Sequence, residues 1–143
     1  MPMILKYVPL CSGDVLEIGS GLFSTPLLHW LCKGLGKNLI TYENDERFFN
    51  FAQTFEDETH KVILIKDWND IPVKQYGVVL IDHAPESRRA VDAIKFKDSE
   101  YVIMHDTEAR VYGYDQVWPH FEHRFDWKDC RPWTSVVSNI KLL

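Results

Sequence analysis

The sequence of 143 residues predicts an α/β fold: a doubly wound, mostly parallel sheet of strand order 3-2-1-4-5 with an antiparallel C-terminal hairpin. Short apolar runs without polar alternation recur along the chain, as expected for strands that are buried on both faces. Amphipathic stretches separate these runs, and strand–helix–strand repetition gives parallel strands with right-handed crossovers. The C-terminal part is instead rich in aromatic residues and histidine, which marks a different local architecture.

The expected strands and helices alternate from residue 15 to residue 104. The strands are expected at residues 15–18, 39–42, 62–65, 78–81 and 101–104. The helices are expected at residues 24–32, 45–55 and 86–96. Ser24 or Thr25 is the expected N-cap of the first of these helices, with Pro26 in its first turn. Asn44 or Asp45 is the expected N-cap of the second.

The tail after residue 106 is expected to add antiparallel strands to the sheet. Residues 121–127 alternate between apolar and polar side chains, and residues 134–140 do so in part. A helix is expected near residues 115–121. The tail aromatics are expected to pack over the sheet, and because aromatic residues are enriched at interfaces, we also predict a homodimer to which the tail contributes.

Composition and charge limit the classes of function. Lysine and arginine number 16 against 21 aspartates and glutamates, so the net charge is −5, and a broad basic surface for nucleic acid is disfavoured. The length suits one domain, residues 1–143. No apolar stretch is long enough to span a membrane, and no signal peptide is recognised. The cysteines, Cys11, Cys32 and Cys130, lack metal-site or disulfide spacing, which predicts buried, reduced thiols in a cytoplasmic protein.

A glycine turn after the first expected strand is the main functional signal. Gly19 and Gly21 allow close approach of the backbone to a ligand at a helix N-terminus. Glu43 ends the second strand, where an acid accepts both hydroxyls of a ribose. A dinucleotide site would have a third glycine where Ser24 stands, and Glu17, just before the turn, suits a cationic ligand better than a pyrophosphate.

Over about residues 13–107 the chain resembles the class I S-adenosyl-L-methionine-dependent methyltransferases. The matching segments are residues 17–21 (Glu-Ile-Gly-Ser-Gly), 42–44 (Tyr-Glu-Asn), 66–68 (Lys-Asp-Trp), 79–82 (Val-Leu-Ile-Asp) and 105–107 (His-Asp-Thr). The resemblance implies S-adenosyl-L-methionine as the cofactor, with Glu43 on the ribose, Asp67 near the adenine amine and Trp68 beside its ring. The full set of cofactor-binding residues that it implies is Glu17, Gly19, Ser20, Gly21, Glu43, Asn44, Asp67, Trp68 and Asp82. Two departures are Phe23, where the family commonly has a third glycine, and the lack of N-terminal helices that form a substrate pocket.

The expected reaction centre lies at the ends of the fourth and fifth strands. Asp82 and His83 follow one strand and His105 and Asp106 end the other, so their side chains are expected to meet at one edge. They suit a general base with its orienting carboxylate, and His83 is the favoured base. A divalent metal between the carboxylates is the alternative and is not favoured. Arg88 and Arg89 are expected on a solvated helix face, or as ligands of a substrate anion.

The favoured function is methyl transfer to an oxygen or nitrogen atom of a small-molecule acceptor. Two alternatives remain open. One is an oxidoreductase that binds NAD(P), against which the serine at position 24 counts. The other is a non-catalytic module that binds S-adenosyl-L-methionine or a nucleotide as a subunit of a larger assembly.

Overall fold

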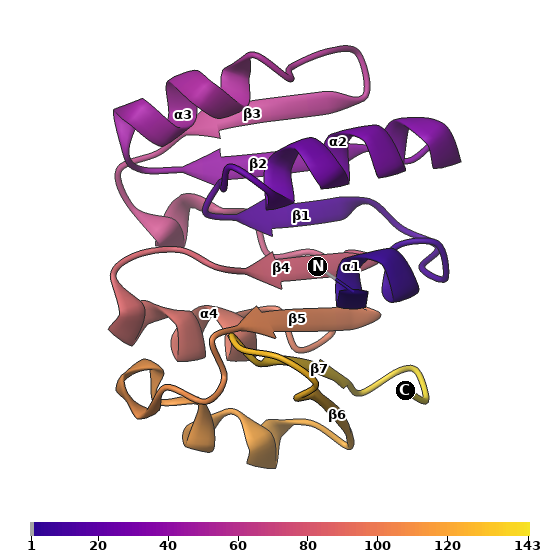
Figure 1. The fold of residues 1–143 in the computed structure, drawn as a ribbon, viewed down its shortest axis with the longest axis vertical. Helices are drawn as coiled ribbons and strands as arrows, with labels where there is room; N and C mark the ends of the chain where they lie inside the picture. Colours follow the sequence, from indigo (N-terminus) through magenta and orange to yellow (C-terminus); the bar gives the residue numbers. More distant parts are fainter. Residues whose placement is uncertain (1) are drawn as a thin grey trace.

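The computed structural model describes residues 2–143, and its strands form one seven-stranded sheet in the order β3-β2-β1-β4-β5-β7-β6 (Figure 1). The strands are β1 (Val15–Ile18), β2 (Leu39–Glu43), β3 (His60–Leu64), β4 (Val78–Ile81), β5 (Tyr101–His105), β6 (His123–Trp127) and β7 (Thr134–Ser138). Strands β1 to β5 pair in parallel. Strand β7 pairs antiparallel with both β5 and β6. The predicted fold class, strand order and hairpin are therefore confirmed.

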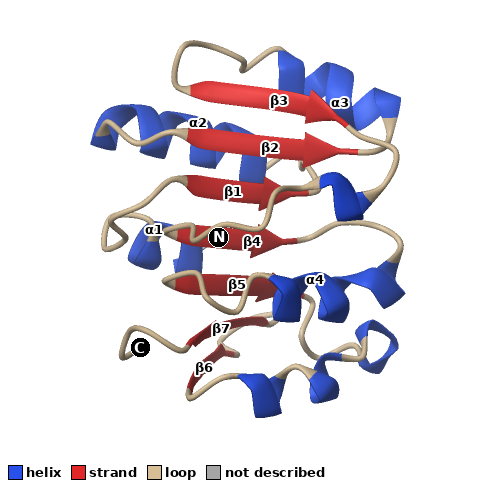
Figure 2. Ribbon diagram, turned by 180° about the vertical axis from the view of Figure 1, so that it is seen from behind, coloured by secondary structure: helices blue, strands red, loops and turns tan. Residues whose placement is uncertain are grey.

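Helices cover both faces of the sheet. The α-helices are α1 (Pro2–Tyr7), α2 (Ser24–Leu35), α3 (Glu46–Gln53) and α4 (Arg89–Lys95). Helices α1 and α2 share one apolar core with the sheet, whereas α4 packs into a second core on the opposite face (Figures 1 and 2). The 3-10 turns are η1 (Trp68–Asp70), η2 (Glu86–Arg88), η3 (Arg110–Tyr112), η4 (Tyr114–Gln116) and η5 (Trp118–His120).

The two helix starts differ in the way that they are capped. Asp45 caps α3 as predicted, because its carboxylate accepts hydrogen bonds from the amides of Arg47 and Phe48. The N-cap of α2 is instead Phe23, which makes no side-chain cap. The prediction of Ser24 or Thr25 was wrong, because both lie within the helix and the Thr25 hydroxyl donates to the carboxylate of Glu17.

One helix was missed, and two other local predictions were wrong. Helix α1 was not predicted from the sequence. The helix expected near residues 115–121 is the pair of 3-10 turns η4 and η5. Strand β3 was expected to be buried on both faces, but Ile63 and Leu64 are exposed because β3 lies at the edge of the sheet and only one neighbouring strand pairs with it.

The aromatic tail packs within the chain itself. Tyr114 and Val117 are buried in the α4-side core, and Tyr112, Trp118 and Phe121 pack against that core. The tail aromatics therefore supply no separate reason for a homodimer, which stays a prediction. Among residues 2–143, no helix has the length and apolar character needed to cross a bilayer.

Candidate active site

A tight turn brings the end of β1 against the end of β4. Gly19 has φ +86°, and a Cβ atom at this position would lie 2.6 Å from the Cα atom of His83. Both the left-handed conformation and the close approach favour glycine. The turn therefore fixes where Ser20 and Gly21 stand relative to the β4–α4 connection.

A buried carboxylate beneath this turn holds it in place. Glu17 has no solvent exposure, and its Oε2 atom accepts hydrogen bonds from Thr25 Oγ1 at 2.9 Å and Thr41 Oγ1 at 2.8 Å. Thr25 Oγ1 in turn accepts from the Gly21 amide at 3.0 Å. Burial raises the pKa of Glu17 to about 7. The predicted direct contact of Glu17 with a ligand is not what this geometry provides, because its carboxylate lies inside the protein and orders the turn instead.

The carboxylate of Glu43 connects the ends of β1 and β2. Its Oε2 atom accepts from the Ser20 amide at 2.7 Å and from Ser20 Oγ at 2.9 Å. Its Oε1 atom accepts from the amides of Asn44 at 2.7 Å and Asp45 at 2.9 Å. All four donors come from within the chain, so a ligand hydroxyl at Glu43 has to replace one of them, and the rotatable Ser20 hydroxyl is the easiest to replace.

Asp67 and Trp68, in the connection that follows β3, point in different directions. Asp67 is exposed and accepts a hydrogen bond from the Asn69 amide at 2.8 Å at the start of η1. Trp68 is only 5% exposed, and its Nε1 atom donates to the Ala84 carbonyl at 2.9 Å. Its ring lies against the His83 imidazole, with the ring centroids 4.5 Å apart. Trp68 is therefore a core residue, and the predicted stacking on an adenine would require it to leave this packing.

His83, the base favoured from the sequence, is buried next to the carboxyl end of β4. Its Nε2 atom lies 2.9 Å from Asp92 Oδ2, and the side chains of both residues have no solvent exposure. Arg88 also binds Asp92 through Nε at 3.0 Å. This pairing turns the imidazole toward Asp92 on α4, so the geometry does not favour His83 as the general base.

Arg89 is the functional-site residue that the sequence analysis missed. It was expected on a solvated helix face or as a ligand of a substrate anion, but it is buried and binds two carboxylates of the chain itself. Its Nη1 atom lies 3.0 Å from an oxygen of Asp106, and its Nη2 atom lies 3.0 Å from an oxygen of Asp82. Its Nε atom donates to the His83 carbonyl at 2.6 Å. One signal in the sequence could have indicated the burial of Arg89. Ala93 was expected to face the core, and Arg89, four positions earlier in the helix, lies on the same face.

Asp106 is held in a conformation that few residues adopt. It is the one non-glycine residue with positive φ (+59°) within residues 2–143. Such backbone conformations are uncommon outside glycine, and asparagine and aspartate adopt them most readily. Its Oδ2 atom also accepts from the Tyr112 hydroxyl at 3.3 Å. Arg89 and Tyr112 together fix the Asp106 carboxylate at the end of β5.

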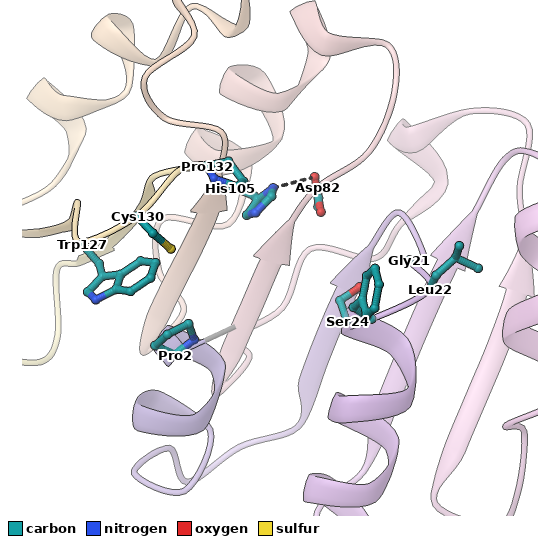
Figure 3. A pocket seen from close by; sticks show the side chains of 10 residues that line it. Pro2, Gly21, Leu22, Ser24, Asp82, His105, Trp127, Cys130 and Pro132 are labelled. Carbon is teal, nitrogen blue, oxygen red and sulfur yellow. Dashed lines mark ion pairs between the residues drawn. The ribbon is translucent and has the colours of Figure 1, made fainter.

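His105 faces a cavity of about 380 Å³ that opens beside the sheet edge (Figure 3). Its Nδ1 atom lies 3.5 Å from Asp82 Oδ1 and 3.3 Å from Asp106 Oδ1. Burial opposes a charge on the imidazole, but the two carboxylates outweigh this effect and raise the pKa of His105 above its ordinary value. His105, unlike His83, therefore lines this cavity and lies beside two carboxylates.

Two cavities meet at Asp82. The larger one is bordered by Gly21, Asp82 and His105. The second has about 210 Å³ and is bordered by Gly19, Ser20, Glu43, Asn44 and Asp82, among others. The glycine turn thus stands between two spaces that share one carboxylate. This arrangement suits two ligands that approach each other above the ends of β1 and β4.

The acidic cluster offers an incomplete site for a divalent metal. One potential ligand atom from each of Asp82, His105 and Asp106 lies within 4.8 Å of the others. The guanidinium of Arg89, however, already lies 3.0 Å from both carboxylates. A divalent cation beside this fixed positive charge would be repelled, so the donor set fits an Arg-compensated pair of acids better than a metal.

Comparison with known proteins identifies the fold. No family model and no curated sequence matches the chain. An O-methyltransferase from Bacillus cereus in complex with S-adenosylhomocysteine aligns with a TM-score of 0.65 at 17% identity, over 94% of this chain and 77% of that one. The N-terminal domain of human METTL16, also in complex with S-adenosylhomocysteine, gives 0.64 at 13% identity over 99% and 72%. A methyltransferase from Pyrococcus furiosus gives 0.59 at 17% identity over 96% and 83%. The chain therefore has the fold of S-adenosyl-L-methionine-dependent methyltransferases.

Proposed function

We propose that the chain is an S-adenosyl-L-methionine-dependent methyltransferase that methylates an oxygen or nitrogen atom of a small-molecule acceptor. The observation that carries this proposal is the meeting of two cavities at Asp82, with the glycine turn between them. Two of the structurally similar methyltransferases hold S-adenosylhomocysteine. A shared fold does not define the acceptor, which depends on the chemistry of the site.

The cofactor is placed in the cavity bordered by Gly19, Ser20, Glu43 and Asn44. The Glu43 carboxylate takes the ribose hydroxyls in exchange for the Ser20 hydroxyl, while the amides of Ser20, Asn44 and Asp45 keep it in position. The exposed Asp67 remains the proposed partner of the adenine amine. Glu17 acts indirectly, by holding the turn through Thr25.

His105 replaces His83 as the proposed general base. Bound S-adenosyl-L-methionine supplies an electrophilic methyl group. The acceptor atom forms a bond to the methyl carbon as the carbon–sulfur bond breaks, and the electron pair of that bond remains on sulfur as S-adenosylhomocysteine is formed. His105 takes the proton that the acceptor loses, and Asp82 and Asp106 stabilise the resulting imidazolium. Arg89 positions both carboxylates.

Calorimetric titration with S-adenosyl-L-methionine, S-adenosylhomocysteine and NAD tests the proposal. The first two should bind and NAD should not. Glu43→Ala should weaken the binding of S-adenosylhomocysteine by about 1.5–3 kcal/mol, or about 10- to 150-fold, because hydrogen bonds to a charged group are lost. The matched control is Glu46→Ala, which removes an exposed carboxylate three residues further along the chain, in the first turn of α3. Selective binding of NAD would instead support an oxidoreductase, and cofactor binding without methylation of any acceptor would support a non-catalytic module.

A further inference from the structure

The larger cavity has apolar walls and a polar floor. It lies between the start of α1, the turn that leads into α2, and the β6–β7 connection (Figure 3). The apolar wall consists of Pro2, Leu22, Phe23, Trp127, Cys130 and Pro132. Asp82 and His105 lie together at the floor, joined by their ion pair. Its volume of about 380 Å³ falls within the range of pockets that hold small molecules.

Two large apolar side chains of the wall are exposed to solvent. Phe23 is 78% exposed and Leu22 is 59% exposed, and they are consecutive residues at the same side of the cavity. Covering such side chains with an apolar ligand removes them from water, which is favourable. Trp127 on another wall offers an aromatic ring, and aromatic rings pair preferentially with other aromatic rings in offset or edge-to-face geometry.

The charges around the cavity exclude most ionic ligands. Within residues 2–143, no lysine or arginine is among the residues that line it. The nearby Arg89 already binds Asp82 and Asp106. A phosphate or carboxylate would therefore meet the carboxylate of Asp82 at the floor and no lysine or arginine that is free to bind it. A cationic ligand gains little, because Arg89 compensates the acids.

We propose that this cavity binds a neutral aromatic molecule that bears a hydroxyl or amino group, with its ring against the apolar wall at Trp127 and the polar group at His105. Calling this molecule the methyl acceptor rests on the proposed function, whereas its binding does not. Phenols and aryl amines are the acceptor classes that meet these requirements. Each carries the proton that His105 has to remove.

Cys130 provides a direct test, because its thiol lies in the cavity wall. Cys130 is exposed, so the prediction of a buried thiol was wrong for this cysteine, whereas Cys11 and Cys32 are buried as predicted. A mild alkylating reagent such as iodoacetamide should therefore label Cys130 first. The alkylation rate is measured without any cofactor, in the presence of 2-naphthol, its saturated analogue decahydro-2-naphthol, or 2-naphthoate. 2-Naphthol should slow labelling by the factor 1 + [L]/Kd, about threefold at twice the Kd. The saturated and anionic analogues should have little effect.

Substitutions separate ring recognition from general burial. Trp127→Leu keeps an apolar side chain but removes the ring, so the ratio of its labelling rates without and with 2-naphthol should fall to about 1, whatever its own unprotected rate. Trp133→Leu is the matched control, because Trp133 lies in the same hairpin but does not line this cavity, and protection should persist. A folded Trp127→Leu variant, verified by its circular dichroism, keeps the result interpretable.

Several outcomes would overturn the inference. These are equal protection by 2-naphthol and decahydro-2-naphthol, stronger protection by 2-naphthoate, or undiminished protection in Trp127→Leu. Labelling that slows with protein concentration alone would also overturn it, because a second copy of the chain would then cover the cavity. Failure of S-adenosylhomocysteine to bind, with protection by 2-naphthol intact, would refute the proposed function and leave the aromatic ligand established.

Discussion

The imidazole of His83 lies 2.9 Å from the carboxylate of Asp92, and neither side chain has solvent exposure. This buried pair joins the residue two positions after β4 to helix α4. Removing the imidazole leaves a cavity beside Trp68 and deprives a buried carboxylate of one of its partners. His83 is thus expected to act on stability, whereas His105 acts on the reaction.

The two histidines give a matched pair of variants. His83→Ala should lower the free energy of unfolding by about 1.5–3 kcal/mol, the value of a hydrogen bond to a charged group. His105→Ala, at a partly exposed position, should lower it by less than about 1 kcal/mol. The measurement is urea-induced unfolding followed by circular dichroism. The reverse order of the two losses would contradict the structural role of His83.

Methyl transfer should show the opposite order. With a phenol that the wild-type protein methylates, His105→Ala should reduce turnover by about 10²-fold, the contribution of a general base. His83→Ala should retain most of the activity at a temperature where it is folded. Release of S-adenosylhomocysteine is the readout. Turnover abolished by a chelator and restored by Mg²⁺ would instead assign the acceptor's activation to a metal.

The charge of Asp82 should set the titration of His105. The neighbouring carboxylates raise the pKa of His105, so Asp82→Asn should lower it, because one anion that favours the imidazolium is removed. Conversely, Arg89→Met should raise it by removing a cation near the same group. NMR titration of the His105 C2 proton measures both shifts without an acceptor. Shifts of the same sign in the two variants would exclude this electrostatic account.

Arg89 should matter to stability through the two acids that it joins. Arg89→Met leaves Asp82 and Asp106 close together without their cation, which should cost about 1–3 kcal/mol after allowance for their partial exposure. Adding Asp106→Asn should recover part of the loss, because one of the two like charges is then gone. Arg47→Met, which breaks an exposed ion pair with Asp45, is the control and should have little effect. An Arg89→Met loss that Asp106→Asn does not reduce would contradict the charge argument.

Much of the fold follows from sequence pattern alone, because its signals are local. Apolar runs such as residues 78–81 have to be buried on both faces, and a run of this kind between helices specifies a parallel strand. The turn at Gly19 was also identifiable, since its residue type matches the conformation that the turn requires. Helix α1 was not, because six residues beside a strand carry too little periodicity to be recognised.

The chemistry of the site was less accessible, because it depends on side-chain direction. His83 and His105 each adjoin an aspartate near the end of a strand, and nothing in the sequence states which ring turns inward. The direction of the His83 ring depends on Asp92, which lies on α4 and pairs with the imidazole. Arg89 was missed for the same reason, because its partners Asp82 and Asp106 come from two different strand ends. Long-range partners of this kind become visible only in three dimensions.

Glu17 should make the stability of the protein depend on pH. Its pKa is raised by burial from 4.5 to about 7, so the folded state holds a proton that the unfolded state has released between these values. The stabilisation from this group is therefore fully present below about pH 4.5 and is lost as the pH rises through about 7.

Glu17→Gln keeps an oxygen that accepts from Thr25 and Thr41 but cannot ionise. The variant should accordingly lose less stability than the wild type between pH 5 and pH 8, as measured by urea unfolding at each pH. Asp67→Asn, at an exposed position outside this network, is the control and should follow the wild-type curve. If Glu17→Gln also follows the wild-type curve across this range, the buried carboxylate is not the titrating group, and the pH dependence of the stability has another source.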